Sequence, residues 1–207
     1  MKICIKILVF VWLAVSWTAA AGQHVDVRGR ASLRIDSIVH DTDLWTCGQL
    51  ILFSSKEPVV CNEHGRVVSG MLGNNSLILC ADSRFREFAR DFHVTFDDKG
   101  LLVSGTMSTP LEIVIQEQHV TSIPHTEVAF FPNGVIKYFV PSDNFRYTTA
   151  DGFKFSVAAG NKVTFDEEGR LRTAIMARRR IMQNPDGTQR VFLPGDVVKI
   201  DETGLIE

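Results

Sequence analysis

Apolar and polar residues alternate over short stretches along most of this chain, and turn residues separate the stretches. Residues 94–102 (VTFDDKGLL) and 163–171 (VTFDEEGRL) show the pattern clearly. Each has an apolar-x-apolar triplet, a four-residue turn that ends in glycine, and the start of a second apolar stretch. Alternation with a period of two places the apolar side chains on one face of a β-strand. The pattern therefore predicts hairpins of short strands.

The turns recur at a nearly constant spacing. They end at Gly65, Gly100, Gly134, Gly169 and Gly204, which are 35, 34, 35 and 35 residues apart. Such self-similarity is typical of repeat architectures, in which neighbouring units together bury an apolar face that one unit cannot bury alone. The sequence predicts a β-repeat domain over 59–207, with units at 59–93, 94–127, 128–162 and 163–197 and a partial unit at 198–207.

The residues of these turns indicate how each hairpin closes. Asp or Asn at the first position accepts hydrogen bonds from the turn backbone, Pro132 supplies a preset φ, and glycine takes the positive φ of the fourth position. A second hairpin follows in each unit, as in Arg179–Gln183 and Thr188–Leu193 on either side of Asn184–Gly187. The predicted fold class is therefore all-β, an antiparallel meander that forms either an elongated twisted sheet or a solenoid-like stack.

Two stretches depart from the repeat. Residues 22–58 contain strand-like runs without a clear copy of the turn, as expected for an atypical N-terminal capping element. Residues 83–92 (SRFREFARDF) place Phe85, Phe88 and Phe92 at i, i+3 and i+7, a spacing that favours a short helix with Asp82 or Ser83 as the N-cap. Either a helix or a strand is expected there.

The N-terminal residues 1–21 have the pattern of a cleaved signal peptide. Lys2 and Lys6 precede the apolar run Ile7–Val15, and Ala19–Ala21 gives the A-x-A pattern of a cleavage site. The run is shorter than the ~20 residues that a spanning helix needs. We therefore expect export through the secretory pathway to the periplasm or the cell exterior, with no transmembrane helix after signal cleavage.

Charge and cysteine content narrow the function classes. The chain has 22 Lys and Arg against 24 Asp and Glu, a net charge of −2, which does not favour nucleic-acid binding. Three cysteines follow the signal segment: Cys47, Cys61 and Cys80. Export permits a disulfide, and Cys47 and Cys61 are the candidate pair because their strands would be neighbours, which leaves Cys80 as a free thiol.

The acidic turns and the histidines are candidates for metal or catalytic chemistry. Calcium loops use oxygen ligands at alternate positions, whereas the turns that begin at Asn62 and Phe131 lack the leading acid. No histidine pair has the spacing of a helical zinc site, and neither a G-x-S-x-G motif nor a phosphate-binding glycine loop occurs. The sequence therefore predicts structural turns, no metal site, no cofactor and no catalytic residue.

A group of arginines distinguishes the last full unit. One interpretation is a solvated strand face that the acidic turns balance. The other is an anion-recognising patch for an acidic protein surface or a glycan, since guanidinium groups suit planar anions. The residues of this candidate binding patch are Arg170, Arg172, Arg178, Arg179, Arg180 and Arg190.

The function hypothesis follows from the architecture. Stacked repeats commonly present extended binding surfaces. We expect an exported, non-enzymatic module of the cell envelope or exterior that binds an unknown protein or glycan partner or has a structural role. The alternative is an envelope enzyme whose site is assembled across strands from His93, His119 or His125. An outer-membrane barrel ranks below both, because barrel strands need ~10 alternating residues.

Overall fold

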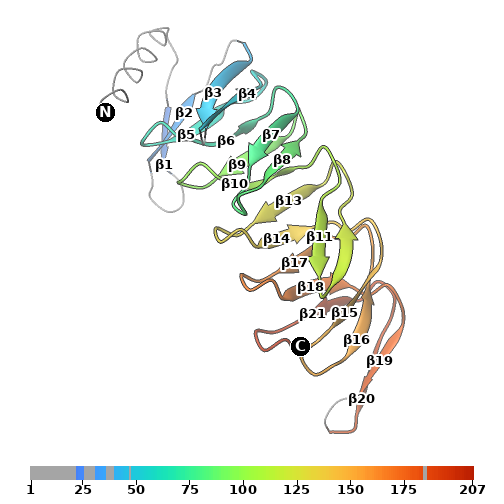
Figure 1. Ribbon diagram of the computed structural model, residues 1–207. Coiled ribbons are helices and arrows are strands. Elements are labelled where there is room, and N and C mark those ends of the chain that lie inside the picture. Colours follow the sequence, from blue (N-terminus) through green and yellow to red (C-terminus); the bar gives the residue numbers. More distant parts are fainter. Residues whose placement is uncertain (1–21, 26–30, 36–39, 47, 184–185) are drawn as a thin grey trace, which may run out of the picture.

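The computed structural model describes residues 22–25, 31–35, 40–46, 48–183 and 186–207. These residues form 21 strands and contain no helix (Figure 1). Eleven strands make one antiparallel sheet in the order β1-β2-β5-β6-β9-β10-β13-β14-β17-β18-β21, and the others form five two-stranded hairpins. The predicted all-β antiparallel meander is confirmed.

The strands are short throughout. Those of the large sheet are β1 (Gly22–Val25), β2 (Ala31–Ile35), β5 (Val59–Asn62), β6 (Val67–Met71), β9 (His93–Phe96), β10 (Leu102–Thr106), β13 (Glu127–Phe130), β14 (Ile136–Phe139), β17 (Val163–Phe165), β18 (Leu171–Ile175) and β21 (Val197–Lys199). Those of the hairpins are β3 (Thr42–Thr46), β4 (Gln49–Phe53), β7 (Ser76–Leu79), β8 (Phe85–Phe88), β11 (Glu112–Ile115), β12 (Gln118–Thr121), β15 (Phe145–Thr148), β16 (Lys154–Val157), β19 (Arg180–Gln183) and β20 (Gln189–Phe192).

Each unit contributes two sheet strands and one hairpin. A glycine turn joins the two sheet strands, and the second of them pairs with the first sheet strand of the next unit, as β6 does with β9. The hairpin is inserted between these two paired strands and folds over one face of the sheet (Figure 1). Residues 22–58 follow the same order, with β1–β2 in the sheet and β3–β4 as the hairpin. The connection between β1 and β2 lies outside the described residues.

The five glycine turns are present as the sequence predicts. Their glycines have φ between 72° and 87°, the left-handed region that favours glycine. In one of them Asp97 Oδ1 accepts hydrogen bonds from the backbone N–H groups of Lys99 and Leu101, at 2.9 and 2.8 Å. Where Phe131 replaces the leading acid, Asn133 Oδ1 accepts from the Val135 N–H at 3.0 Å. The leading side chains thus stabilise turns.

The short helix considered for residues 83–92 is wrong. The segment holds the strand β8, in which Arg86 pairs with Ile78 of β7. Phe88 is buried, whereas Phe85 and Phe92 are exposed, so the three rings share no helical face. A strand is favoured because it places Phe88 over the sheet, where Gly105 leaves room for its ring.

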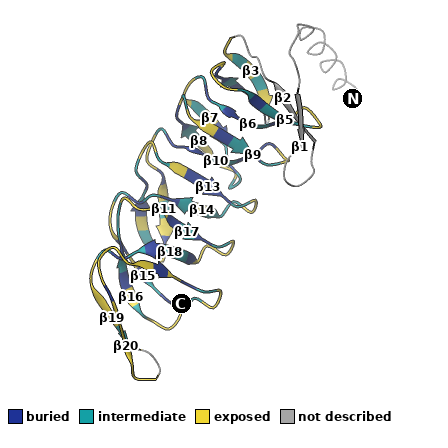
Figure 2. Cartoon of the chain, turned by 180° about the vertical axis from the view of Figure 1, so that it is seen from behind, coloured by how far each residue is buried: buried dark blue, intermediate teal, exposed yellow. Residues whose placement is uncertain are grey.

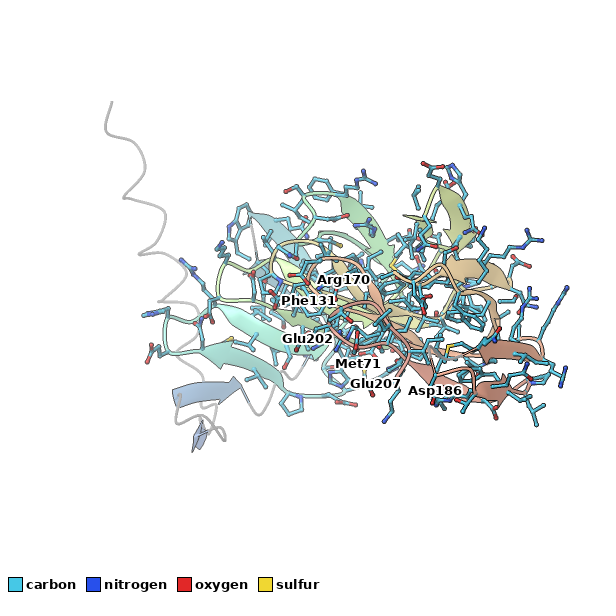
Figure 3. All side chains as sticks on the ribbon, turned by 90° about the horizontal axis from the view of Figure 1, so that it is seen from below. Met71, Phe131, Arg170, Asp186, Glu202 and Glu207 are labelled. Carbon is cyan, nitrogen blue, oxygen red and sulfur yellow. The ribbon has the colours of Figure 1, made fainter. Side chains whose placement is uncertain are left out.

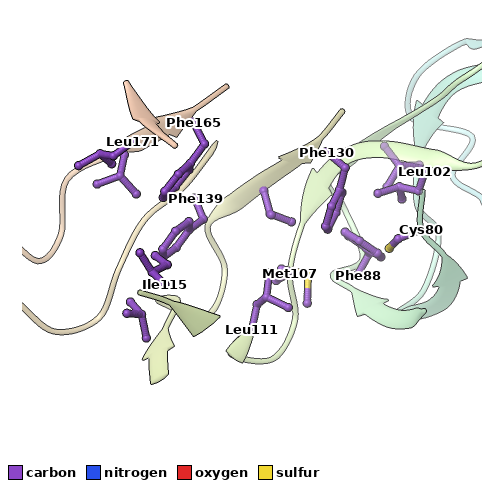
Figure 4. Packing of buried hydrophobic residues seen from close by; sticks show 14 of the residues in the cluster. Cys80, Phe88, Leu102, Met107, Leu111, Ile115, Phe130, Phe139, Phe165 and Leu171 are labelled. Carbon is purple, nitrogen blue, oxygen red and sulfur yellow. The ribbon is translucent and has the colours of Figure 1, made fainter. Parts of the chain in front are cut away.

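The core lies between the sheet and the hairpins and continues from one unit to the next (Figures 2 and 4). Phe139 of β14 and Phe165 of β17 stack across the boundary between two units, with ring centroids 5.9 Å apart and planes within 7°. Figure 4 shows these rings in one row with Phe130 and Phe88. Burial of such side chains supplies most of the stabilisation, because one unit has too little apolar surface of its own.

Side-chain sizes in the hairpin and in the sheet are complementary. Phe53 lies over Gly70 and Phe88 over Gly105, and a Cβ on either glycine would come within 2.8 Å of the ring. In the next two units the same hairpin position is Ser122 and Val157, as the bridges Ser122↔Pro141 and Val157↔Met176 indicate. Their sheet partners at the glycine position are Phe139 and Ala174. A smaller residue on one layer thus accompanies a larger one on the other, which keeps the core filled.

Candidate functional site

Gly100 and Gly134 are 34 residues apart, whereas the other successive turn glycines are 35 apart, and this difference corresponds to a shortened hairpin tip. Three residues span the tip of β7–β8 between Cys80 and Arg84, which are joined by a backbone hydrogen bond of 2.9 Å, and Thr149 and Phe153 close the β15–β16 tip in the same way at 3.0 Å. The tip of β11–β12 has only two residues, Gln116–Glu117. The residue by which the unit 94–127 is shorter is therefore missing from this tip.

The shortened tip has strained backbone and is bonded to the next hairpin. Gln116 and Glu117 have φ of 46° and 63°, as a two-residue type I′ turn requires, although neither is Gly, Asn or Asp. The Gln116 amide bonds the backbone of Thr148 in β15, donating to its oxygen at 2.7 Å and accepting from its N–H at 2.9 Å. Gln118 bonds Arg146 in the same manner, at 2.8 and 3.1 Å. Two side-chain amides thus join β11–β12 to the next hairpin.

The tips of β7–β8 and β15–β16 each contact a glycine turn, and this tip does not. A Cβ on Gly134 would lie 2.6 Å from the Cα of Asp82, and the Ala150 N–H donates to the Gly204 oxygen at 3.0 Å. Near Gly169, by contrast, the nearest atom to a Cβ would be Val135 Cγ1 at 3.7 Å. Open space therefore remains where the tip of β11–β12 would otherwise meet the turn.

This space is a groove of about 570 Å³. Its size falls within the range of about 300–1,000 Å³ that is common for ligand sites. Ile113, Ile115, Ile136 and Phe165 contribute apolar surface to it, and every residue of β11 lines it. The charged residues that line it are Asp82, Arg84, Arg86, Glu112 and Arg170. An apolar body with a few polar groups around it is the usual composition of a binding site.

Arg86 is the most unusual residue of the groove. The corresponding positions of three other units hold the buried residues Ile51, Val120 and Phe155, and that of the last unit holds Arg190, so an arginine here takes the place of a core side chain of the neighbouring units. Its side chain is only 10 % exposed, its Nη1 lies 2.5 Å from Asp82 Oδ1, and its guanidinium is 5.1 Å from the Phe130 ring centroid. Burial lowers the pKa of Arg86, but the hydrogen bond and charge of Asp82 outweigh this effect and raise it. A fully charged guanidinium is thus fixed at the groove.

The other charges around the groove are neutralised to different degrees. Arg170 bonds Asp166 and Glu168, each at 2.9 Å, and Glu112 pairs with His119 at 2.6 Å. The exposed side chain of Arg84 has no ion pair or hydrogen bond with any other described residue. The groove therefore has one uncompensated positive charge, beside the buried pair of Arg86 and Asp82.

The structure divides the arginine patch that the sequence suggests. Arg170 and Arg172 lie at the turn end of β18 and line a hollow of about 490 Å³ with acidic residues that include Glu202. Arg170 and Glu202 are labelled in Figure 3. Arg178, Arg179 and Arg180 follow the other end of β18 and are exposed. Arg190 lies over the Phe192 ring at 4.8 Å and hydrogen-bonds the Glu207 backbone oxygen. A common binding role for all six stays a prediction.

The cysteines behave as core residues. Cys61 and Cys80 are buried, neither forms a disulfide with another described residue, and burial raises the pKa of each to about 11. Cys47 lies outside the described residues, so its pairing with Cys61 stays a prediction.

The histidines of the enzyme hypothesis occupy separate exposed places. His93 pairs with Glu57 at 2.5 Å, His119 pairs with Glu112, and His125 is in a turn with φ of 58°. Among the described residues no group of three or more His, Cys, Asp or Glu side chains could hold a metal ion. The described part of the chain also has no helix long and apolar enough to cross a membrane.

Comparisons with known protein families, with curated proteins and with solved structures find no match to this chain.

Sequence reasoning missed the groove, although two signals were present. The first is the shorter spacing between Gly100 and Gly134, which marks the lost tip residue. The second is Arg86, which is a charged residue in a repeat position that is otherwise apolar in the neighbouring units. Alignment of the hairpins as well as the glycine turns would have revealed both.

Proposed function

We propose that this protein is an exported, non-enzymatic binding module and that the groove between the β7–β8 and β11–β12 hairpins holds its ligand. The proposal of export depends on the signal-peptide pattern of residues 1–21. The single observation that supports ligand binding is the fixed Arg86–Asp82 pair beside an apolar groove that opens where one hairpin tip is shortened. Buried ion pairs are weak contributors to stability, so retention of one at a groove favours a role in recognition.

The groove can be closed without altering the sheet. Replacement of Gln116–Glu117 by Ala-Asp-Gly, the tip sequence of Ala150–Gly152, restores three residues to the β11–β12 tip. We expect this tip to bend towards Gly169 and fill the groove, as the other tips approach Gly134 and Gly204. The variant should keep its far-ultraviolet circular dichroism and lose its ligand.

The experiment is a retention assay with the mature chain, residues 22–207, immobilised and exposed to an extract of its own cell envelope and culture medium. Proteins and glycans retained by the wild type and not by the closed-groove variant support the proposal. The control is Glu117→Gly, which keeps the two-residue tip and should retain the same molecules. Equal retention by the wild type and the closed variant, or no retention by either, contradicts it.

A further inference from the structure

The groove borders a strand edge that has no partner. Among the described strands β11 pairs with β12 alone, and all residues from Glu112 to Gln116 line the groove. A two-residue type I′ turn closes on a hydrogen-bonded pair, here Ile115 and Gln118, so the next pair, Val114 and His119, is non-hydrogen-bonded. The backbone N–H and C=O of Val114 therefore point away from β12, on the edge that borders the groove. A free edge of this kind can pair with an added strand.

The hairpin on the other side keeps the groove open. β8 and the segment that leads into β11 are joined at their base, where the Ser108 N–H donates to the Glu87 oxygen at 3.0 Å. Beyond this bond no described backbone group links β8 to β11. The matching gap between β12 and β15 is bridged by the Gln116 and Gln118 amides, so β11 has the free edge and β12 does not.

We infer that the groove binds an extended peptide segment that adds a strand to the free edge of β11 and carries both apolar and acidic side chains on the face that enters the groove. This inference rests on the proposed function. Main-chain hydrogen bonds to Val114 would give affinity, and side chains at alternate positions would give specificity, as in other cases of strand addition.

The side-chain preference follows from the two faces that an added strand presents. Successive side chains of a strand point to opposite faces, so one set points into the groove, towards Ile136 and Phe165. Arg84 lies opposite the buried Cys80 in the β7–β8 hairpin and so leaves β8 on the same sheet-facing side as Arg86, where it lines the groove and forms no ion pair or side-chain hydrogen bond with another described residue. Apolar residues of the inward set suit the positions beside Ile136 and Phe165, and Asp or Glu suits the position beside Arg84, because a carboxylate can form a bidentate pair with arginine.

The probe is a short fluorescent peptide of repeated Val-Val-Glu-Glu, which places both Val and Glu on each face of a strand, and its binding to the mature chain is measured by fluorescence anisotropy. A peptide of repeated Val-Val-Lys-Lys with the same label is the charge control. We expect the Val–Glu peptide to bind at least about tenfold more tightly than the Val–Lys peptide, the discrimination of one charged hydrogen bond. Equal affinities, or no binding of the Val–Glu peptide, would overturn the inference.

Two pairs of variants separate the side-chain contribution from the main-chain contribution. Arg84→Glu should weaken binding of the Val–Glu peptide at least about tenfold, whereas Arg90→Glu, an equal change of charge outside the groove lining, should leave it within about twofold. Val114→Pro removes the outward N–H and should abolish binding, whereas Val114→Ala keeps it and should bind as the wild type does. Unchanged affinity in Arg84→Glu contradicts the inference even if Val114→Pro fails to fold.

The outcomes also distinguish this inference from the proposed function. If the wild type and not the closed-groove variant retains molecules from the extract, while the Val–Glu peptide does not bind, the groove is a site for another class of ligand and only the inference fails. If neither the extract nor the peptide gives groove-dependent binding, the proposed function fails as well.

Discussion

At the scale of single residues, the fold depends on matched side-chain volumes at the contact between hairpin and sheet. Gly70 and Gly105 have no conformational need to be glycine, because neither has a positive φ. Both are required because a phenylalanine of the overlying hairpin occupies the place of their missing side chain. Where the hairpin residue is Ser122, the sheet carries Phe139 instead. The identity of one residue therefore depends on another residue about 17 positions away, through contact and not through local propensity.

Gly105→Ala tests this dependence. An added Cβ would lie 2.8 Å from Phe88 Cδ1, so the variant should lose about 1–3 kcal/mol of unfolding free energy in urea. The double variant Phe88→Leu, Gly105→Ala should lose less than the sum of the two single changes, because the smaller side chain makes room for the methyl group. Strict additivity of the two changes would contradict the contact.

At the scale of elements, the hairpins differ in how their edges are joined, although the sheet strands repeat faithfully. The backbone of β15 at Arg146 and Thr148 is bonded by side-chain amides of Gln116 and Gln118 and not by a strand. These bonds also hold two residues of the β11–β12 tip at positive φ, which costs about 1–2 kcal/mol per residue. The amide contacts thus maintain the shape of the tip that opens the groove.

Removal of these amides should be visible at the neighbouring strand. Gln116→Ala and Gln118→Ala should each destabilise the protein by about 1 kcal/mol, since each leaves β15 backbone groups without a partner. Hydrogen exchange should accelerate at the Thr148 amide in Gln116→Ala and at the Arg146 amide in Gln118→Ala. The control is His119→Ala, which changes a residue of β12 next to Gln118. If the Thr148 and Arg146 amides exchange at the same rates in the glutamine variants as in His119→Ala, the side-chain amides do not protect β15.

Sequence reasoning predicts some of these elements correctly and misses others. The turn chemistry and the period-two alternation are local, so they predicted the glycine turns and the meander. The helix considered for residues 83–92 failed because the spacing of Phe85, Phe88 and Phe92 fits a helix as well as a strand, and only contact with Gly105 decides between them. The groove was missed because it depends on a comparison of hairpin tips across units, and Arg86 is unusual only in that comparison.

At the scale of the whole molecule, the chain is a stack in which each unit contacts its immediate neighbours (Figure 1). The stability of such a protein is approximately the sum of the unit stabilities and the interfaces between neighbours. A destabilising substitution in one unit should therefore have only a local effect on stability, unless that unit lies between two well-packed neighbours.

Phe192→Ala tests this property in the last hairpin. Phe192 is buried against Phe153 of the preceding hairpin, at 6.3 Å between ring centroids, so its truncation should remove about 3–5 kcal/mol from that interface. We expect faster hydrogen exchange in β17 to β21 and unchanged exchange in β5 to β10. A uniform increase along the chain would show that the stack unfolds as one cooperative unit.

Shape and stability are encoded separately in this chain. The sheet register is set by the glycine turns, whereas the length of each hairpin tip leaves that register unchanged, as the two-residue tip at Gln116–Glu117 demonstrates. A protein of this design can therefore gain, lose or move a groove through the insertion or deletion of a single codon at a tip. The scaffold persists while the position of the groove evolves.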